Sequence, residues 1–509
     1  MMDRRDFFAS AGLLPLAAAR AQTAAASPGP NFLILMADQH SPHVLGCHGD
    51  RVVRTPNLDR LAARGVTFRS AYCQSPLCVP SRMSFLTGRR PSDIRVWGNG
   101  DTLPSDTPTF AHALGAAGYE TVLIGRMHFN GMDQWHGFER REVGSLLPIY
   151  PGLPMPMPER LMVGARNGSR EGVQLAGPGR TAYQAYDAEV TERTTAFLRR
   201  KAASSSRPFC AVAGFVLPHS PFICSRAQWD YYLPRVTVPE VPPGYFETLH
   251  PAVQRWRAIR GLEKVTAEEV RKARAGYYGL VSDLDDRIGQ VLRVLEETGL
   301  DRNTVVLYTS DHGEMAGELG MWWKMNCYEG AVSVPLIVSC PSRFQGGRQL
   351  SQVVELVDVA ATLTDLAGTA PMPSAAGKSL VPLLRNQTAA WRNEAFSEYP
   401  AAPPVPAMRM IRRDRWKLIH YEGERPQLFD LEKDPQELRD LGAVPEYARI
   451  RGELQERALA GWSAAEIQQV LAQRAAEAAL VGKWAAKVKP RPEAQWTPPP
   501  GANVFPDPN

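Results

Sequence analysis

The sequence predicts an α/β protein: one large, mainly parallel sheet sandwiched by helices, with a smaller α+β domain near the C-terminus. Short apolar runs rich in β-branched residues alternate with helical patterns, which is typical of parallel sheets. Polar and charged residues directly follow four of these runs, where parallel sheets bind their ligands. After residue 384 the composition changes, and a strand-turn-strand pattern at 408–421 indicates the second, smaller unit.

Five runs have the length and apolar character of buried strands, at residues 32–36, 121–124, 209–216, 304–308 and 334–338. The helices between them carry recognisable start and stop signals. Thr55-Pro56 opens one helix that Gly65 closes, and Thr107-Pro108 opens another that reaches Gly118. The longest predicted helix covers residues 267–297, where apolar residues recur every three or four positions.

Composition divides the chain into four parts. Residues 1–21 have the pattern of a signal peptide, 28–389 form the main domain, 390–488 a small α+β domain with a helical extension, and 489–509 a proline-rich tail. Two segments rich in proline and glycine, at about 145–180 and 217–262, interrupt the alternation of strands and helices. Insertions at the ligand-binding edge of a sheet commonly form substrate walls or lids.

The N-terminal segment resembles a twin-arginine export signal. Arg4 and Arg5 precede a modest apolar stretch that ends in Ala19-Arg20-Ala21, a small-x-small cleavage pattern. This pattern predicts a periplasmic or secreted protein that is exported in the folded state. An amphipathic N-terminal helix or an uncleaved anchor is the alternative. After residue 25, no apolar run approaches the ~18 residues of a membrane span.

Charge and cysteine content narrow the function classes. The 58 Lys and Arg residues barely exceed the 53 Asp and Glu residues and form no basic stripe, so nucleic acid is not an expected partner. The seven cysteines form no CxxC pair and no zinc spacing. An oxidising destination permits disulfides. Because seven is an odd number, at least one cysteine stays unpaired or has another use.

Four predicted strands deliver charged or metal-competent side chains at their carboxyl ends. One such strand would be unremarkable, but the carboxyl ends of parallel strands share one edge of the sheet. The sequence therefore predicts one composite site. Its residues are Asp38 and Gln39, Arg126 and His128, His219, and Asp311 and His312.

Residues 75–88, SPLCVPSRMSFLTG, resemble the signature of the sulfatase family. Cys78, Pro80, Ser81 and Arg82 match its C-x-P-S-R core, and Leu-Thr-Gly follows at 86–88. The resemblance implies an alkaline-phosphatase-type α/β core with a small C-terminal domain, and makes 28–389 the catalytic sulfatase domain. It covers nearly the whole mature chain, through matches at 38–39, 55–59, 125–128, 218–219, 310–314, Lys324 and a C-terminal FDL…DP motif.

In sulfatases with this motif the cysteine is oxidised to formylglycine, whose hydrated aldehyde is the nucleophile. For Cys78 the resemblance implies a formylglycine-generating enzyme as a partner during maturation. One hydroxyl of the hydrate attacks sulfur, and the other collapses to the aldehyde and ejects sulfate. Met83, Phe85 and Leu86 predict a helix whose N-terminus faces residue 78 and favours an anion there. A buried or disulfide-bonded cysteine and an unconverted thiol nucleophile are the alternatives.

The resemblance also implies a metal site. Asp38, Gln39, Asp311 and His312 match the family's metal ligands, with Cys78 at the same site. Two carboxylates and an amide oxygen suit a hard divalent cation. The family more commonly has Asp at position 39 and Asn at 312; the glutamine lowers the charge of the site and the histidine makes it softer. We expect one Ca²⁺, with Mn²⁺ or Mg²⁺ as alternatives, and a solvated turn is the structural alternative at 311–312.

Four further matches imply roles at the sulfate group. Arg82 would hold the formylglycine hydrate and the metal ligands, and His128 would hydrogen-bond the diol and help to deprotonate it. His219 and Lys324 would bind a sulfate oxygen and protonate or stabilise the leaving alkoxide.

Arg126 departs from the family pattern, which usually has lysine at this position. The guanidinium keeps the charge but adds bulk and a bidentate fork. It remains a candidate catalytic residue. We expect structural roles for His40, His43 and His48.

Together these residues predict hydrolysis of a sulfate monoester to an alcohol and sulfate. Residues 125–139 resemble the choline-sulfatase-like branch, yet a small-molecule, aryl or saccharide sulfate all stay open as substrates, as does the oligomeric state. A phosphonate or phosphate mono- or diester hydrolase with the same nucleophile is the main alternative, and an exported anion-binding protein without turnover is another. Seven aromatic residues could cage a quaternary ammonium, stack on a ring or fill the core: Trp97, Trp135, Trp229, Tyr231, Tyr232, Trp322 and Trp323.

Overall fold

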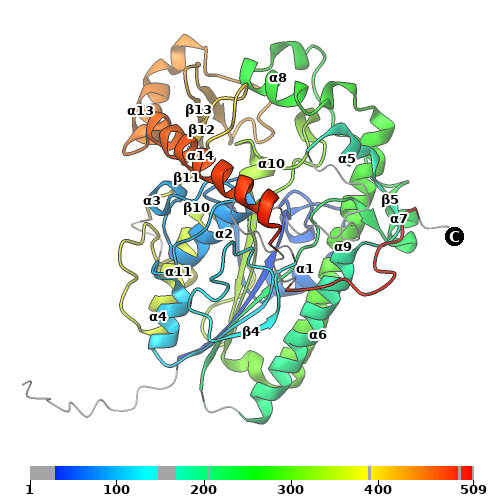
Figure 1. Cartoon of the computed structure of the whole chain (residues 1–509), viewed down its shortest axis with the longest axis vertical. Helices are drawn as coiled ribbons and strands as arrows, with labels where there is room; N and C mark the ends of the chain where they lie inside the picture. Colours follow the sequence, from blue (N-terminus) through cyan, green and yellow to red (C-terminus); the bar gives the residue numbers. More distant parts are fainter. Residues whose placement is uncertain (1–28, 147–167, 205–206, 388–390, 491–494, 507–509) are drawn as a thin grey trace, which may run out of the picture.

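The computed structural model of the chain describes residues 29–146, 168–204, 207–387, 391–490 and 495–506. An eight-stranded sheet has helices on both faces, and a four-stranded antiparallel sheet with its own helices lies beyond one end of it (Figure 1). The predicted export signal and much of the proline-rich segment at 145–180 fall outside the described residues. None of the described helices is long and apolar enough to cross a membrane.

The large sheet is mainly parallel, as predicted. Five of its strand pairs are parallel, and the two pairs made by β9 are antiparallel. The strand order β10-β2-β9-β8-β1-β6-β3-β4 puts β1 between β8 and β6, near the centre of the sheet. The strands are β1 (Asn31–Ala37), β2 (Val66–Tyr72), β3 (Glu120–Gly125), β4 (Arg140–Val143), β6 (Phe209–Gly214), β8 (Thr304–Ser310), β9 (Ser333–Ser339) and β10 (Arg348–Glu355).

Helices cover both faces of this sheet, which explains why its central strands are almost fully apolar. One face carries α2, α4 and α11, and the other carries α1, α6 and α9 (Figure 1). The helices of the main domain are α1 (Pro56–Ala63), α2 (Cys78–Thr87), α3 (Pro91–Ile94), α4 (Phe110–Ala116), α5 (Arg170–Gln174), α6 (Ala182–Ala203), α7 (Arg226–Tyr232), α8 (Pro251–Ala258), α9 (Ala267–Glu297), α10 (Glu329–Val332), α11 (Val357–Ala367) and α12 (Val381–Leu384). The short strands β5 (Gly177–Pro178) and β7 (Ile223–Cys224) pair with each other.

The five predicted strands are confirmed. One strand boundary and one helix boundary are corrected. The strand predicted at 209–216 ends at Gly214. Beyond Phe215, the backbone N–H groups of Val216 and Leu217 donate to the Asp187 carboxylate at 2.8 and 2.9 Å instead of to a neighbouring strand. The helix predicted from Thr107 begins at Phe110, where the Thr109 side chain caps it. In this sheet the sequence analysis missed β2, β4 and β10. β10 and β2 pair in parallel at one edge, and β4 forms the other edge.

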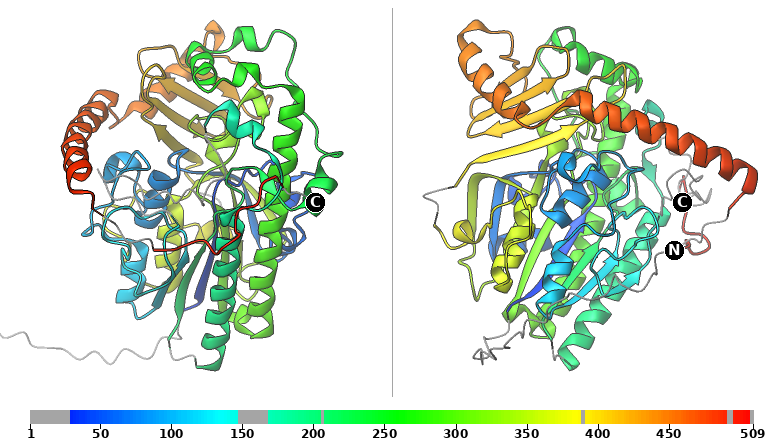
Figure 2. Two further views of the ribbon diagram at one scale, coloured as in Figure 1. Left: turned by 45° about the vertical axis from the view of Figure 1, so that its right-hand side comes forward. Right: turned by 60° about the vertical axis from the view of Figure 1, so that its left-hand side comes forward.

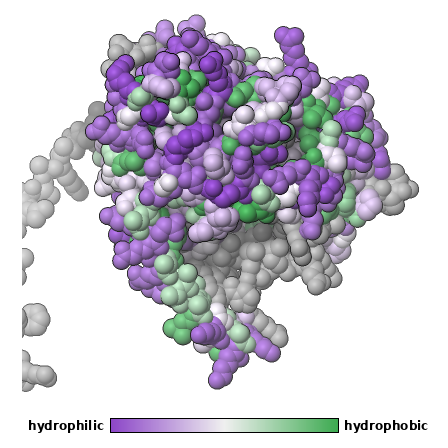
Figure 3. Space-filling view, turned by 90° about the horizontal axis from the view of Figure 1, so that it is seen from above, coloured by the Kyte–Doolittle hydropathy of each residue, from purple (hydrophilic) through white to green (hydrophobic). Residues whose placement is uncertain are grey.

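The smaller sheet consists of β11 (Glu394–Tyr399), β12 (Met408–Arg413), β13 (Trp416–Tyr421) and β14 (Gln427–Asp430). The strand-turn-strand predicted at 408–421 is confirmed as β12 and β13. Helix α13 (Ala448–Leu459) packs on this sheet, whereas α14 (Ala464–Val488) runs across the molecule and projects beyond it (Figure 2). Seen from above, the surface is mostly hydrophilic, with scattered hydrophobic residues (Figure 3). The domain boundary near residue 390 stays a prediction.

The C-terminal tail wraps back onto the main domain. The indole N–H of Trp496 donates to Glu189 at 2.9 Å, and Val504 forms an antiparallel bridge with Arg180. All seven cysteines lie in the described part of the chain and none forms a disulfide.

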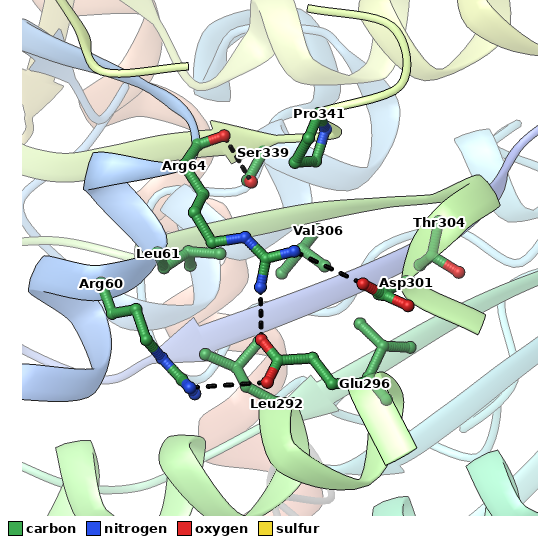
Figure 4. A pocket seen from close by; sticks show the side chains of 11 residues that line it. Arg60, Leu61, Arg64, Leu292, Glu296, Asp301, Thr304, Val306, Ser339 and Pro341 are labelled. Atoms are coloured by element: carbon green, nitrogen blue, oxygen red, sulfur yellow. Dashed lines mark hydrogen bonds and ion pairs between the residues drawn. The ribbon is translucent and has the colours of Figure 1, made fainter. Parts of the chain in front are cut away.

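One small pocket lies at the amino end of β8, far from the strand's carboxyl end (Figure 4). Its charges pair with one another: Arg60 and Arg64 bond Glu296, and Arg64 also bonds Asp301. These exposed ion pairs join the α1 region to the end of α9. Because they leave no unpaired charge for a ligand, we interpret this pocket as structural.

Candidate active site

The structure brings the residues that follow the four predicted strands together at one edge of the sheet. Asp38 follows β1, Arg126 follows β3 and Asp311 follows β8, and all three side chains are buried. His128 and His219 extend the site from the loops after β3 and β6. The composite site expected from the sequence is therefore present as a geometric cluster.

Cys78 is the first residue of α2, so the predicted helix does begin at the cysteine. Its Sγ lies 3.2 Å from His312 Nε2, 3.4 Å from Lys324 Nζ and 3.7 Å from Asp38 Oδ1. The first N–H groups of a helix lack intrahelical partners and favour negative charge. The cysteine therefore lies where an anion, a cation and a helix N-terminus meet.

Arg82 lies one turn further along α2 and forms hydrogen bonds to residues that follow three of the strands. Its guanidinium bonds Asp311 Oδ2 at 2.7 Å, Asp38 Oδ2 at 3.1 Å and the Arg126 carbonyl at 2.9 Å. Arg126 Nε bonds the same Asp38 oxygen at 2.6 Å. Burial alone would raise the pKa of the Asp38 carboxyl, but the positive charges of Arg126, Arg82 and Lys324 hold it well below its ordinary value. Asp38 is therefore ionised.

Asp38, Cys78, Asp311 and His312 form a cluster whose donor atoms all lie within 4.8 Å of one another. We call these four residues the metal cluster. His312 Nδ1 lies 3.0 Å from the Gly313 carbonyl, so Nδ1 carries the ring hydrogen and Nε2 presents a lone pair. That lone pair faces Asp38 Oδ1 at 3.7 Å and Asp311 Oδ1 at 3.6 Å. Three electron-rich atoms directed at one another fit a divalent cation between them.

Gln39 and Lys324 lie beside the metal cluster. Lys324 Nζ donates to Gln39 Oε1 at 2.5 Å and to His219 Nε2 at 3.0 Å. His219 Nδ1 lies 2.6 Å from the Ser220 carbonyl and so carries the ring hydrogen. In this arrangement Lys324, rather than His219, holds the proton that faces the site.

His128 is held as a neutral imidazole. Burial and the neighbouring Arg126 guanidinium lower its pKa well below its ordinary value. Arg126 Nη2 donates to His128 Nδ1 at 2.9 Å, and arginine can only donate. The ring hydrogen of His128 is therefore on Nε2, which can donate a hydrogen bond but does not accept a proton in this tautomer.

Three residues of the site were given no role in the sequence analysis. Asn99 Oδ1 accepts a hydrogen bond from the backbone N–H of Val79 at 3.0 Å, and so provides a partner for the second N–H group of α2, which has none within the helix. Tyr183 sets its ring edge-to-face against His219 at 6.0 Å. Glu314 bonds Gln39. Glu314 belongs to the quoted motif at 310–314, whereas no pattern in the sequence marked Asn99 or Tyr183.

Most of the seven aromatic residues considered for a ligand cage fill the core instead. Trp97, Trp229, Tyr232, Trp322 and Trp323 are buried and Tyr231 is half-buried. Trp135 is 51% exposed. Of the histidines expected to be structural, His40 is buried beside Tyr308, and His43 pairs with Glu318 at 2.8 Å.

Residues 30–369 match a family model described as sulfatase, and residues 317–462 match one described as N-sulphoglucosamine sulphohydrolase, C-terminal. A choline-sulfatase of Rhizobium meliloti (strain 1021) is 36% identical over 432 residues, which cover 82% of this chain and 83% of the relative. Arylsulfatase K of Xenopus laevis is 29% identical, with coverages of 82% and 80%. The crystal structure of a phosphonate monoester hydrolase of Agrobacterium radiobacter matches with a TM-score of 0.70 at 25% identity, over 85% of this chain and 95% of that one.

Replacing Asp38 by asparagine tests the buried charge network. Because the substitution leaves Arg82 and Arg126 short of a carboxylate, we expect the free energy of unfolding of the metal-free protein to fall by about 3 kcal/mol at pH 7. Because folding lowers the pKa of Asp38, its carboxylate stabilises the folded state at every pH above the ordinary pKa of an aspartate. This stabilisation is lost progressively as the pH falls below about 4. The difference between variant and wild type should therefore shrink in acid, as measured by urea unfolding with chelator present.

Asp301→Asn is the matched control, because Asp301 pairs with Arg64 at an exposed position. It should change the free energy of unfolding by no more than about 0.5 kcal/mol at pH 7 and at pH 3. An Asp38 effect of the same size at pH 7 and pH 3 would contradict the proposed ionisation.

Proposed function

The chain belongs to the sulfatase family and is a sulfuric ester hydrolase, and we propose that its nucleophile is formylglycine derived from Cys78. We further propose that the metal cluster, together with Gln39, holds one Ca²⁺, with Mn²⁺ or Mg²⁺ as alternatives. The observation that carries this proposal is the position of the Cys78 sulfur, at the N-terminus of α2 and within 3.7 Å of Asp38, His312 and Lys324.

The formylglycine hydrate supplies two hydroxyl groups on one carbon, one to attack sulfur and one to release sulfate, and the cation supplies positive charge. The chain's own residues supply the rest of the charge balance. Arg82, Arg126 and Lys324 are three cations against the carboxylates of Asp38, Asp311 and Glu314. These charges balance, so a bound divalent cation would leave the site net positive and favour an anion such as a sulfate ester.

The positions of the hydrogens on Lys324, His219 and His128 indicate a different role for each residue. Lys324 holds a proton beside Cys78, so we assign it as the donor that stabilises the leaving alkoxide, with His219 as its hydrogen-bonded partner. His128 Nε2 carries a hydrogen and serves as a hydrogen-bond donor. To deprotonate the diol, as the family pattern implies, His128 must first give up its bond from Arg126.

The substrate that we propose is a small-molecule or saccharide sulfate ester. Choline-sulfatase and arylsulfatase relatives both support an ester of modest size. The structural match to a phosphonate monoester hydrolase keeps a phosphonate or phosphate ester hydrolase as the second candidate.

We also propose that residues 1–21 direct export to the periplasm or beyond, and that a formylglycine-generating enzyme acts on Cys78 before export. The arginine pair and the cleavage pattern support the first proposal. The cysteine motif at 78–82 supports the second. The domain limits given above remain proposals as well.

A panel of esters tests the reaction class. The matured enzyme should hydrolyse at least one of choline sulfate, 4-nitrophenyl sulfate and a monosaccharide sulfate with a higher kcat/KM than phenylphosphonate monoesters or phosphodiesters. Cys78→Ala should abolish every activity, because all would share one nucleophile. A preference for the phosphonate or phosphodiester would favour the second candidate function.

Lys324→Ala tests the assignment of the leaving-group donor. We expect kcat/KM for an alkyl sulfate to fall by about 10²–10⁴-fold, because an alkoxide needs a proton to leave. The loss for 4-nitrophenyl sulfate should be much smaller, since nitrophenolate leaves without protonation. Lys378→Ala, at an exposed position, is the control and should match the wild type. Equal losses for both esters would rule out leaving-group protonation by Lys324.

A further inference from the structure

Gln39 is anchored by its backbone at the centre of the site. It follows β1 in a left-handed conformation, with φ of 69°, and is fully buried. Its backbone N–H donates to Asp311 Oδ1 at 3.1 Å, and its carbonyl accepts from the Tyr277 hydroxyl at 2.8 Å. Because the backbone is held on both sides, the orientation of the terminal amide is the remaining freedom of this residue.

Two partners set that orientation. Gln39 Nε2 donates to Glu314 Oε2 at 2.5 Å, and Gln39 Oε1 accepts from Lys324 Nζ at 2.5 Å. An ionised carboxylate can only accept hydrogen bonds and an ammonium can only donate them. A reversed amide would oppose donor to donor and acceptor to acceptor. The two contacts therefore permit one orientation, with the amide oxygen toward Lys324.

The second oxygen of Glu314 holds the loop that carries Lys324. Glu314 is fully buried, and its Oε1 accepts from the Ala316 N–H at 2.8 Å and the Trp323 N–H at 2.5 Å. An amide oxygen would serve these two N–H groups as well as a carboxylate does. In the described part of the chain no lysine, arginine or histidine forms an ion pair with Glu314, and burial raises the pKa of its carboxyl. Three N–H donors, from Ala316, Trp323 and Gln39, point at its two oxygens and favour the ionised form. Its bond to Gln39 is the contact that a neutral amide could not replace without reversing Gln39.

We propose that Glu314 is a positioning residue, which directs the oxygen of Gln39 rather than its NH₂ group toward Lys324 and the metal cluster. This inference rests on the proposed function, because the value of an oxygen there lies in binding the cation and the lysine. Lys324 Nζ in turn contacts Cys78 Sγ at 3.4 Å and His219 Nε2 at 3.0 Å. Glu314 thus acts on the nucleophile through Gln39 and Lys324.

The proposal predicts the outcome of exchanging the two side chains. Glu314→Gln keeps an oxygen for the two backbone N–H groups but turns a donor toward Gln39, whose amide must then reverse. Gln39→Glu places a second buried carboxylate against that of Glu314, and the two charges repel each other. In the double variant, the amide at position 314 donates to the carboxylate at position 39, whose other oxygen again faces Lys324. Each single variant should be defective and the double variant functional.

The test uses the matured full-length enzyme, with CaCl₂ titrated by calorimetry after chelator treatment, and kcat and KM measured on the preferred sulfate ester. Each single variant should lose about 10–100-fold in Ca²⁺ affinity and in kcat. The double variant should return to within about threefold of the wild type, because the two sites are coupled. Glu318→Gln is the control, since Glu318 lies on the same loop but pairs with His43.

The outcomes separate this inference from the proposed function. A wild type that binds none of Ca²⁺, Mn²⁺ and Mg²⁺ would overturn the proposed metal site itself. A wild type that binds the cation, with Glu314→Gln equal to it in affinity and kcat, would overturn only the role of Glu314. If a single variant fails to fold, the double variant decides. Recovery of folding and Ca²⁺ affinity supports the positioning role, and a double variant as defective as the worse single variant contradicts it.

Discussion

The buried guanidinium of Arg82 is the interaction on which the rest of the site depends. It bonds Asp38, Asp311 and the Arg126 carbonyl, which come from the ends of three different strands. Without it, the two carboxylates would repel each other in a region from which water is excluded. A buried network of this kind adds little net stability, because desolvation offsets the attraction. What it provides is a fixed arrangement of charge around Cys78.

Close backbone contacts in the sheet hold that network in register. A Cβ at Gly214, the last residue of β6, would come within 1.9 Å of the Arg126 carbonyl oxygen. Gly125, at the end of β3, has a φ of 97°, which other residues rarely adopt. The two glycines therefore let β3 and β6 approach closely where they end. As a result the Arg126 carbonyl faces Arg82 and its side chain faces Asp38.

The parts of the site that could be predicted are those set by regular structure. Asp38 and Asp311 follow buried strands, so the strand pattern placed them at one edge. The apolar run after Cys78 predicted the helix, and the family resemblance assigned the cysteine to the site. Lys324 comes from an irregular loop whose residues Ala316 and Trp323 have φ of 47° and 61°, and only the family resemblance pointed to it. Strand β10 was not predicted because the first half of its sequence is polar. The contact of Glu314 with Gln39 was not predicted because it joins positions 275 residues apart, which no local pattern connects.

The measurement that tests the account most directly is the mass of the peptide containing Cys78, from active protein purified from its native host. Conversion of the thiol to an aldehyde should appear as a lighter peptide that reacts with a hydrazide, and its fraction should scale with specific activity across preparations. Fully active protein with an unmodified Cys78 would contradict the formylglycine mechanism and require a thiol nucleophile in its place.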